Sequence, residues 1–516
     1  MTRTPNSLSL SLVSHTNAGK TTLARTLLGR DIGEVRDAPH VTEFADVHTM
    51  LATPAGESLL LWDTPGFGDS LRLVKRLRGT SNPIGWFVSE VWDRWRDRPF
   101  WASQQAMRNV RDEADVMLYL VNASESPEAA GYVQPEMELL GWIDKPVIVL
   151  LNQLGAPREG AFEADELERW RRHLAPHAQV KAVLPLDAFA RCWVQEGALL
   201  QAIEAALAGE RRALMARLRA AWWAQRVQTF DAAMLSLAAS LARLASDAEE
   251  VPDPATFGAR LRRVGTAIGK GLGKSLGLGN DEQSPTALAQ AALAERLDAE
   301  VRANTGELIA LHGLEGRAQG EILSRLATQF ETRLRMDEGK AALWGGMVSG
   351  ALVGLKADIL SGGLTLGGGM LAGGLLGALG AAGLARCVNL VRGTDRSWVA
   401  WNAEALNPFV DAALLRYLAV AHFGRGRGEW VQGESPAHWR EVVERALAPQ
   451  REALAAVWNE REAPGEAGAE ASQTEATIAA ALAAIVRAAA SDALHALYPG
   501  APPLRESAQS AEVASQ

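Results

Sequence analysis

The fold of this chain is constrained most by an apolar strand pattern that runs into a glycine-lysine-threonine loop and then into a helical pattern. From Leu8 to Val13 leucine alternates with serine, as in a half-buried strand, and a helical pattern continues to Gly29. In a loop that leads from a strand into a helix, the backbone N–H groups at the helix N-terminus point outward and bind phosphate. The arrangement therefore predicts a phosphate-binding loop over residues 14–21.

This loop departs from the usual phosphate-binding pattern at its first position, where Ser14 stands in place of glycine. A serine is compatible with the site if the backbone there avoids positive φ. We expect Lys20 to reach the β- and γ-phosphates and Thr21 to be a ligand of Mg²⁺. The nucleotide-binding residues predicted in the loop are Ser14, His15, Thr16, Asn17, Ala18, Gly19, Lys20, Thr21 and Thr22.

A second motif, Asp63-Thr64-Pro65-Gly66, follows another apolar strand pattern. This D-x-x-G arrangement predicts that Asp63 holds Mg²⁺ through water and that the Gly66 amide senses the γ-phosphate. Between the two motifs, Thr42 is expected to bring a second hydroxyl to the Mg²⁺ from a loop that closes over it. An ordinary turn is the alternative for D-T-P-G, but its distance from the first loop favours the nucleotide site. Lys20, Thr42 and Gly66 are the predicted catalytic residues.

The chain has 516 residues, long enough for more than one core. Apolar runs alternate with helical stretches up to about residue 206, which predicts an α/β fold with a mostly parallel sheet. Beyond it, alanine, leucine, arginine and glutamate at helical spacing predict a mainly α-helical C-terminal half. The expected strands are Leu8–Val13, Phe44–Leu51, Ser58–Trp62, Val116–Asn122, Val147–Asn152 and Lys181–Leu184.

Charge and cysteine usage narrow the partners and the compartment. The net charge of −9 argues against a surface that binds nucleic acid by releasing counterions, so nucleic acid is not an expected partner. The two cysteines share no metal-ligand spacing, which favours a reducing compartment. The N-terminus lacks the pattern of a secretory signal, and we expect a cytoplasmic protein.

The stretch S-H-T-N-A-G-K-T-T-L, together with Thr42 and D-T-P-G, resembles the Era and TrmE type of translation-factor-class GTPase over about residues 8–206. Asn152-Gln153-Leu154-Gly155 and the glycine-rich run Gly362 to Gly369 make the chain similar to bacterial GTPases that carry a C-terminal domain of unknown function. The resemblance implies an N-terminal P-loop G domain that binds GTP and GDP with Mg²⁺. It also implies hydrolysis of GTP to GDP and phosphate.

Guanine recognition departs from the family pattern, because Gly155 occupies the position of the aspartate that normally reads guanine. Asn152 remains to contact the base edge and to pin the phosphate-binding loop, and Gln153 beside it is also expected at the nucleotide. Asp187, after the next strand, is either the missing carboxylate or an ordinary helix N-cap. Selectivity for guanine over adenine therefore stays open.

Hydrolysis is also expected to differ from that of Ras-type enzymes, which orient the attacking water with a glutamine after D-x-x-G. This chain has Phe67 at that position. In the potassium-dependent members of the group that it resembles, the asparagine of the loop binds the cation, and Asn17 stands there. We expect slow intrinsic hydrolysis, accelerated by K⁺ or by formation of a homodimer. A loop-stabilising amide is the alternative role of Asn17.

The C-terminal half contains an uncharged run of 27 residues, Ile359 to Ala385, long enough to cross a bilayer. With glycines spaced every four residues, it predicts a helical hairpin that either enters the membrane or packs in a soluble core. The expected order is a G domain over 1–206, helices over 207–339, a glycine-rich hairpin over 340–390, helices over 391–462, a linker over 463–476, a helix over 477–499 and a disordered tail over 500–516.

Three functions are compatible with these sequence features. The favoured one is a GTPase that passes its nucleotide state to a helical region associated with the cytoplasmic membrane or with a membrane protein. The alternatives are an RNA or ribosome-assembly GTPase and a structural membrane protein with a degenerate nucleotide site. Ser14, Gly155 and Phe67 are the best support for the last of these.

Overall fold

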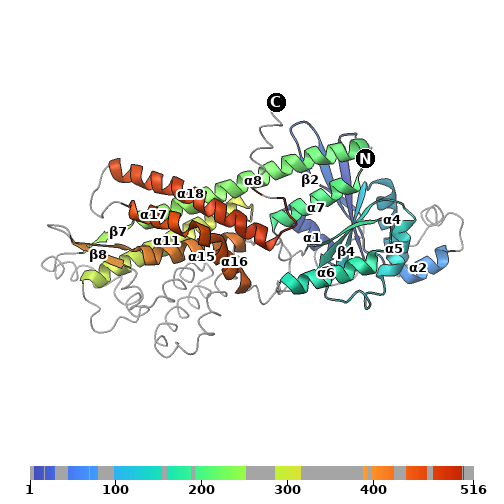
Figure 1. Cartoon of the computed structure of the whole chain (residues 1–516). Helices are drawn as coiled ribbons and strands as arrows, with labels where there is room; N and C mark the ends of the chain where they lie inside the picture. Colours follow the sequence, from blue (N-terminus) through green and yellow to red (C-terminus); the bar gives the residue numbers. More distant parts are fainter. Residues whose placement is uncertain are drawn as a thin grey trace. The chain divides into compact units, whose positions relative to one another are not determined.

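The computed structural model describes residues 5–16, 18–29, 45–68, 70–78, 98–153, 160–186, 192–251, 285–314, 388–392, 397–422, 437–461, 469–502 and 504. The chain divides into two compact units (Figure 1). Unit 1 comprises Met1–Val227, Ala421–Gln432 and Tyr498–Gln516, and unit 2 comprises Gln228–Val420 and Gly433–Leu497.

A six-stranded sheet forms the centre of unit 1, in the order β2-β3-β1-β4-β5-β6. All neighbouring strands are parallel except β2, which runs antiparallel to β3. The prediction of an α/β fold with a mostly parallel sheet is therefore confirmed, and each of the six expected strands is present. Their bounds are β1 Ser7–Ser14, β2 Asp46–Ala52, β3 Ser58–Asp63, β4 Val116–Asn122, β5 Val147–Asn152 and β6 Val180–Pro185.

Helices bury this sheet, and the apolar sequences of β1, β4 and β5 reflect burial on both faces. On one face a single core joins strand residues such as Tyr119 and Val149 to residues of α2, α4, α5 and α6, including Leu73, Met107 and Met137. The described helices that lie wholly or partly within Met1–Val227 are α1 Lys20–Leu28, α2 Ser70–Leu77, α4 Arg98–Asp112, α5 Val133–Gly141, α6 Gly160–Leu174, α7 Trp193–Ala206 and α8 Gly209–Ser246. The boundary between the units falls within α8.

Unit 2 is mainly helical, as the sequence predicted for the C-terminal half. Besides the second part of α8, its described helices are α11 Pro285–Leu311, α15 Ala403–Ala421, α16 Ala437–Leu447, α17 Arg451–Asn459 and α18 Ala469–Leu497, with a 3-10 turn, η2 Ala448–Gln450. A three-stranded antiparallel sheet accompanies them, in the order β7-β9-β8, from β7 Ala248–Glu250, β8 Val388–Arg392 and β9 Ser397–Trp401.

This small sheet corrects the expectation of helices alone over 207–339 and 391–462. The segment Ser397–Trp401 carries valine between two tryptophans, residue types that favour strands, and it pairs on both sides. The linker expected over 463–476 is also partly wrong, because α18 begins at Ala469. Alanine and glutamate in that stretch are strong helix formers, and the helix buries Ile478 and Leu482 further along.

The glycine-rich hairpin lies outside the described residues as far as residue 387, as does most of the expected tail beyond Leu504. The expected end of the hairpin at residue 390 is wrong, because residues 388–390 belong to β8. In the part of the chain that the structure describes, one helical stretch, Thr474–Leu497 in α18, is long and apolar enough to cross a membrane. Half of its most apolar window is buried within the protein, and a core helix of a soluble protein meets the same criteria of length and composition.

Candidate nucleotide-binding site

The phosphate-binding loop connects the buried end of β1 to the first residue of α1, Lys20. Gly19 has φ of 87°, a conformation that glycine adopts without strain. Ser14 instead ends β1, and among the described residues only Asp144 and Gln153 combine a side chain with positive φ. A serine at the first loop position therefore causes no backbone strain.

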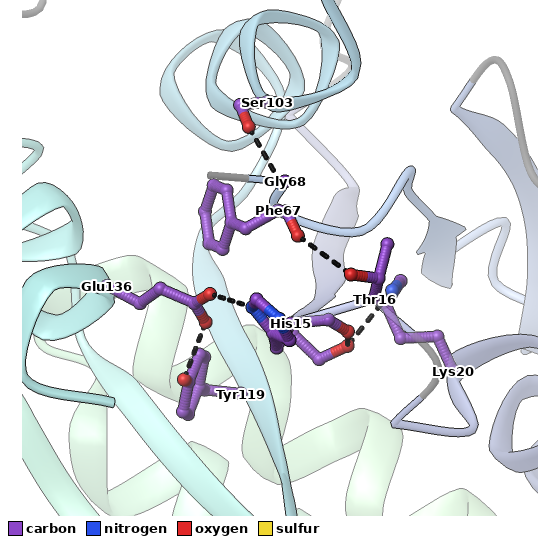
Figure 2. Close-up of polar contacts among 9 residues, drawn as sticks. His15, Thr16, Lys20, Phe67, Gly68, Ser103, Tyr119 and Glu136 are labelled. Carbon is purple, nitrogen blue, oxygen red and sulfur yellow. Dashed lines mark hydrogen bonds and ion pairs between the residues drawn. The ribbon is translucent and has the colours of Figure 1, made fainter. Parts of the chain in front are cut away.

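Lys20 is almost completely buried, and its Nζ donates a hydrogen bond to Ser14 Oγ at 2.9 Å (Figure 2). Burial lowers the pKa of Lys20 to about 8, although the negative charges of Asp63 and Glu136 act in the opposite direction. The buried ammonium group of Lys20 is therefore bonded to the hydroxyl of Ser14, and no carboxylate among the described residues accepts a hydrogen bond from it. Such a group is suited to a phosphate oxygen.

Thr21 and Asp63, the predicted Mg²⁺ ligands, lie together. Thr21 Oγ1 donates to Asp63 Oδ2 at 2.6 Å, while Asp63 Oδ1 is buried and has no hydrogen-bond partner among the described residues. Burial raises the pKa of Asp63 to about 6, against the hydrogen bond from Thr21 and the charge of Lys20. A buried carboxylate oxygen without a partner, beside a hydroxyl, fits a hydrated Mg²⁺ ion, which keeps several of its waters. Thr42 lies outside the described residues.

The D-x-x-G segment packs directly on the loop. Phe67 N donates to Ser14 O at 2.8 Å, and Thr16 N donates to Phe67 O at 3.2 Å. A Cβ on Gly66 would lie 3.0 Å from Lys20 Nζ and from Thr16 Cα, so a side chain at this position would require its neighbours to shift by a few tenths of an ångström. The Phe67 side chain is fully buried in the core and cannot orient an attacking water.

On the base side, Asn152 is buried at the end of β5, and its Nδ2 donates to Ala18 O at 2.9 Å. This bond ties the loop to the sheet. Gln153 follows with φ of 60°, an uncommon conformation for a residue other than glycine. Asn17, Gly155 and Asp187 lie outside the described residues.

Sequence reasoning missed a polar cluster behind the loop, drawn in Figure 2. His15 Nδ1 and Glu136 Oε1 are 2.7 Å apart, and Tyr119 Oη donates to Glu136 Oε2 at 2.7 Å. The His15 ring also stacks on Tyr132, with ring centroids 4.6 Å apart. The available signal was Glu136 itself, a carboxylate among apolar residues at the helical spacing of Val133 and Leu140.

Comparison with known proteins agrees with this geometry. The family model described as a 50S ribosome-binding GTPase matches residues 9–153, so unit 1 contains a GTP-binding P-loop GTPase domain. A second model, described as a domain of unknown function (DUF3482), matches residues 172–487, more than half of the chain. The chain therefore belongs to the DUF3482 family. No curated protein matches it.

Solved structures with similarity to this chain include two of Era and one of an elongation factor. Era in complex with MgGDPNP and part of 16S ribosomal RNA shares 19% identity over 35% of this chain and 51% of its own, with a TM-score of 0.26. Aquifex aeolicus Era bound to GDP and AlF4⁻ has the same identity and coverage and a TM-score of 0.25. Bacterial selenocysteine-specific elongation factor EF-Sec shares 16% identity over 35% of this chain and 25% of its own, with a TM-score of 0.22. The chain thus spans about half the length of the two Era structures.

Proposed function

We propose that this protein is a guanine-nucleotide switch that binds GTP and GDP with Mg²⁺ and hydrolyses GTP slowly. The observation that carries this function is the arrangement of Lys20, Thr21 and Asp63, in which Asp63 Oδ2 accepts from Thr21 while the buried Oδ1 has no hydrogen-bond partner among the described residues. Thr21, Thr42 and, through water, Asp63 hold the Mg²⁺, which supplies positive charge to the β- and γ-phosphates when bound. Lys20 adds a fixed cation on the same side.

The remaining residues of the proposed site orient the nucleotide. The loop residues 14–22 direct backbone N–H groups at the phosphates, and the Gly66 amide meets the γ-phosphate. Asn152 holds the loop and the base edge, with Gln153 beside it and Asp187 as the carboxylate that reads guanine. The bond from Asn152 to Ala18 O supports the first part of that role.

A low intrinsic rate of hydrolysis is proposed because Phe67 is fully buried at the position from which Ras-type enzymes orient water. Without that group, charge that develops between the β- and γ-phosphates needs another cation. We propose K⁺ bound by Asn17, or a second copy of the chain, as its source.

We also propose that different regions of the chain have different roles. Residues 1–206 form the G domain, and α8 carries the chain into the helical region over 207–339. The glycine-rich segment up to residue 387 joins this region to the cytoplasmic membrane or to a membrane protein, and the rest of unit 2, from β8 to α18, completes it. The uncharged run Ile359 to Ala385 supports this association.

Phosphate release by the full chain tests this function. With GTP and Mg²⁺, we expect slow turnover that is faster in K⁺ than in Na⁺, and loss of the difference in Asn17→Ala. Equal rates in both salts, unchanged by Asn17→Ala, would contradict the K⁺ role. Nucleotide binding without turnover in any salt would contradict the enzyme and favour a structural protein with a degenerate site.

A ribosomal role is the second candidate, favoured by the description of the model that matches residues 9–153. The net charge of −9 weighs against a large RNA-binding surface. Fractionation separates the two proposals, because a protein inserted in the membrane stays in the membrane pellet after a high-salt wash. A ribosome factor is released by the same wash.

A further inference from the structure

Asp46 is an exposed carboxylate at the start of β2, and no cation pairs with it in the part of the chain that the structure describes. Its partner across the antiparallel β2–β3 pair is Asp63, the last residue of β3. Residues directly opposite each other in antiparallel strands carry their side chains on the same face, with Cβ atoms about 5 Å apart. The two carboxylates therefore lie side by side at one end of the strand pair.

The face that these two side chains share is the one that α1 covers. Along β3, Leu59 and Leu61 are buried on alternate positions, and Asp63 continues the same period. Helix α1 packs on β2 and β3, and its Thr21 donates to Asp63 Oδ2 at 2.6 Å. Asp46 is thus the exposed neighbour of the Thr21–Asp63 pair, on the side of the sheet where that pair lies.

Two negative charges in this position are unfavourable without a further cation. Like charges directly opposite each other destabilise a strand pair, and β2 is an edge strand that pairs with β3 alone. Burial is the main cause of the raised pKa of Asp63, and the charge of Asp46 acts in the same direction, against Lys20 and Arg25. Asp63 Oδ1 is also buried and has no hydrogen-bond partner among the described residues. A cation beside the two carboxylates would turn their repulsion into attraction.

We propose that Asp46 is a second carboxylate of the Mg²⁺ site and accepts hydrogen bonds from waters bound to the ion. Mg²⁺ keeps several of its waters and takes few protein ligands, so an exposed carboxylate beside Asp63 suits such a role. Groups that hydrogen-bond to the ligands of a metal ion orient them and strengthen its binding. This inference rests on the proposed function, and it adds a residue of the edge strand β2 to a site otherwise assigned to Thr21, Thr42 and Asp63.

Removal of the Asp46 charge tests the proposal. Calorimetric titration of the full chain with GDP, once with Mg²⁺ and once with EDTA, gives the factor by which Mg²⁺ strengthens GDP binding. We expect this factor to fall about tenfold in Asp46→Asn, as when a group that supports a metal ligand is removed. In EDTA, the same variant should bind GDP at least as tightly as the wild type, because it lacks a negative charge near the proposed phosphate site.

Two further variants and a melting curve separate this role from a structural one. Asp46→Glu keeps the negative charge and should retain most of the Mg²⁺ effect. Asp165→Asn makes the same change in net charge at an exposed position on α6, and it should leave GDP binding unchanged with and without Mg²⁺. In EDTA without nucleotide, Asp46→Asn should melt no lower than the wild type, because it relieves the repulsion from Asp63.

The outcomes distinguish failure of this inference from failure of the proposed function. If Mg²⁺ strengthened GDP binding equally in the wild type and in Asp46→Asn, the role of Asp46 would be wrong and the nucleotide site would stand. Equal weakening of GDP binding with Mg²⁺ and with EDTA, together with a lower melting temperature, would also overturn the role, because it would indicate general loosening. If the wild-type chain did not bind GDP, both proposals would fall.

Discussion

Two buried carboxylates act on Lys20, and they differ in how far the protein itself satisfies them. Asp63, at the end of β3, accepts one hydrogen bond, from Thr21, and its second oxygen has no partner in the part of the chain that the structure describes. Glu136, on α5, has a partner on each oxygen. The difference supports the proposal that Asp63 receives Mg²⁺, whereas the hydrogen-bonding capacity of Glu136 is met by the protein itself.

The largest expected effect comes from Lys20, which lies near both carboxylates. Lys20→Ala removes the buried cation that we propose binds the phosphates, and we expect affinity for GDP to fall by about 100-fold, the size of two charge-assisted hydrogen bonds. Calorimetry on the full chain measures it, with Lys181→Ala, an exposed lysine on β6, as the control. Unaltered GDP binding in Lys20→Ala would show that the loop is not the nucleotide site.

The contrast between the two carboxylates predicts opposite effects of amide substitution on stability. Glu136→Gln leaves at least one donor facing an NH₂ group, and we expect a loss of about 2 kcal/mol in the free energy of unfolding. Asp63→Asn removes a buried charge with one unsatisfied oxygen, so we expect a change within about 0.5 kcal/mol or a gain. Urea unfolding of the nucleotide-free chain measures both. Equal losses of unfolding free energy in the two variants would contradict the distinction between Glu136 and Asp63.

The pKa of Asp63 predicts how this contrast depends on pH. Burial raises that pKa from 3.8 to about 6, so between these values the folded chain keeps a proton that the unfolded chain releases. The stability that this proton contributes is fully present below pH 3.8 and is lost as pH rises through 6. Mg²⁺ competes with the same proton.

The effect of Mg²⁺ on nucleotide affinity should therefore be constant above about pH 6 and fall about tenfold per pH unit below it. Calorimetric titrations with and without Mg²⁺ from about pH 5 to 8 measure this dependence. Asp63→Asn should bind nucleotide with little dependence on Mg²⁺ across that range. A Mg²⁺ effect that stayed constant down to the acid end of the range would contradict the assignment of Asp63.

Much of unit 1 was predictable from the sequence because its signals are local. Apolar runs mark β4 and β5 to the residue, and the glycine-lysine-threonine loop marks the start of α1. The cluster around Glu136 was not predictable, since it depends on the register that pairs Val13 with Tyr119 and so brings β4 beside the loop. In unit 2, the three residues of β7 are too few to show a period, and their pairing with β9 is made across a long stretch of sequence.

The smallest expected effect concerns an exposed ion pair that involves a residue of α5. Arg78, which follows the last residue of α2, is paired with Glu138 on α5, the helix that carries Glu136, but Arg78 is well exposed and Glu138 is only partly buried. Exposed ion pairs contribute little, so Arg78→Gln should cost less than about 0.5 kcal/mol in urea unfolding. A loss as large as that of Glu136→Gln would mean that contact between α2 and α5, rather than the buried carboxylate, stabilises this part of the fold.

The central claim, a guanine-nucleotide site at the phosphate-binding loop, is tested most directly by calorimetric titration of the full chain with GDP and, in parallel, ADP in Mg²⁺ and K⁺. We expect one GDP bound per chain and much weaker binding of ADP, which would mean that guanine is read although Gly155 replaces the usual aspartate. No binding of GDP to the folded chain, or equal binding of ADP, would contradict the claim.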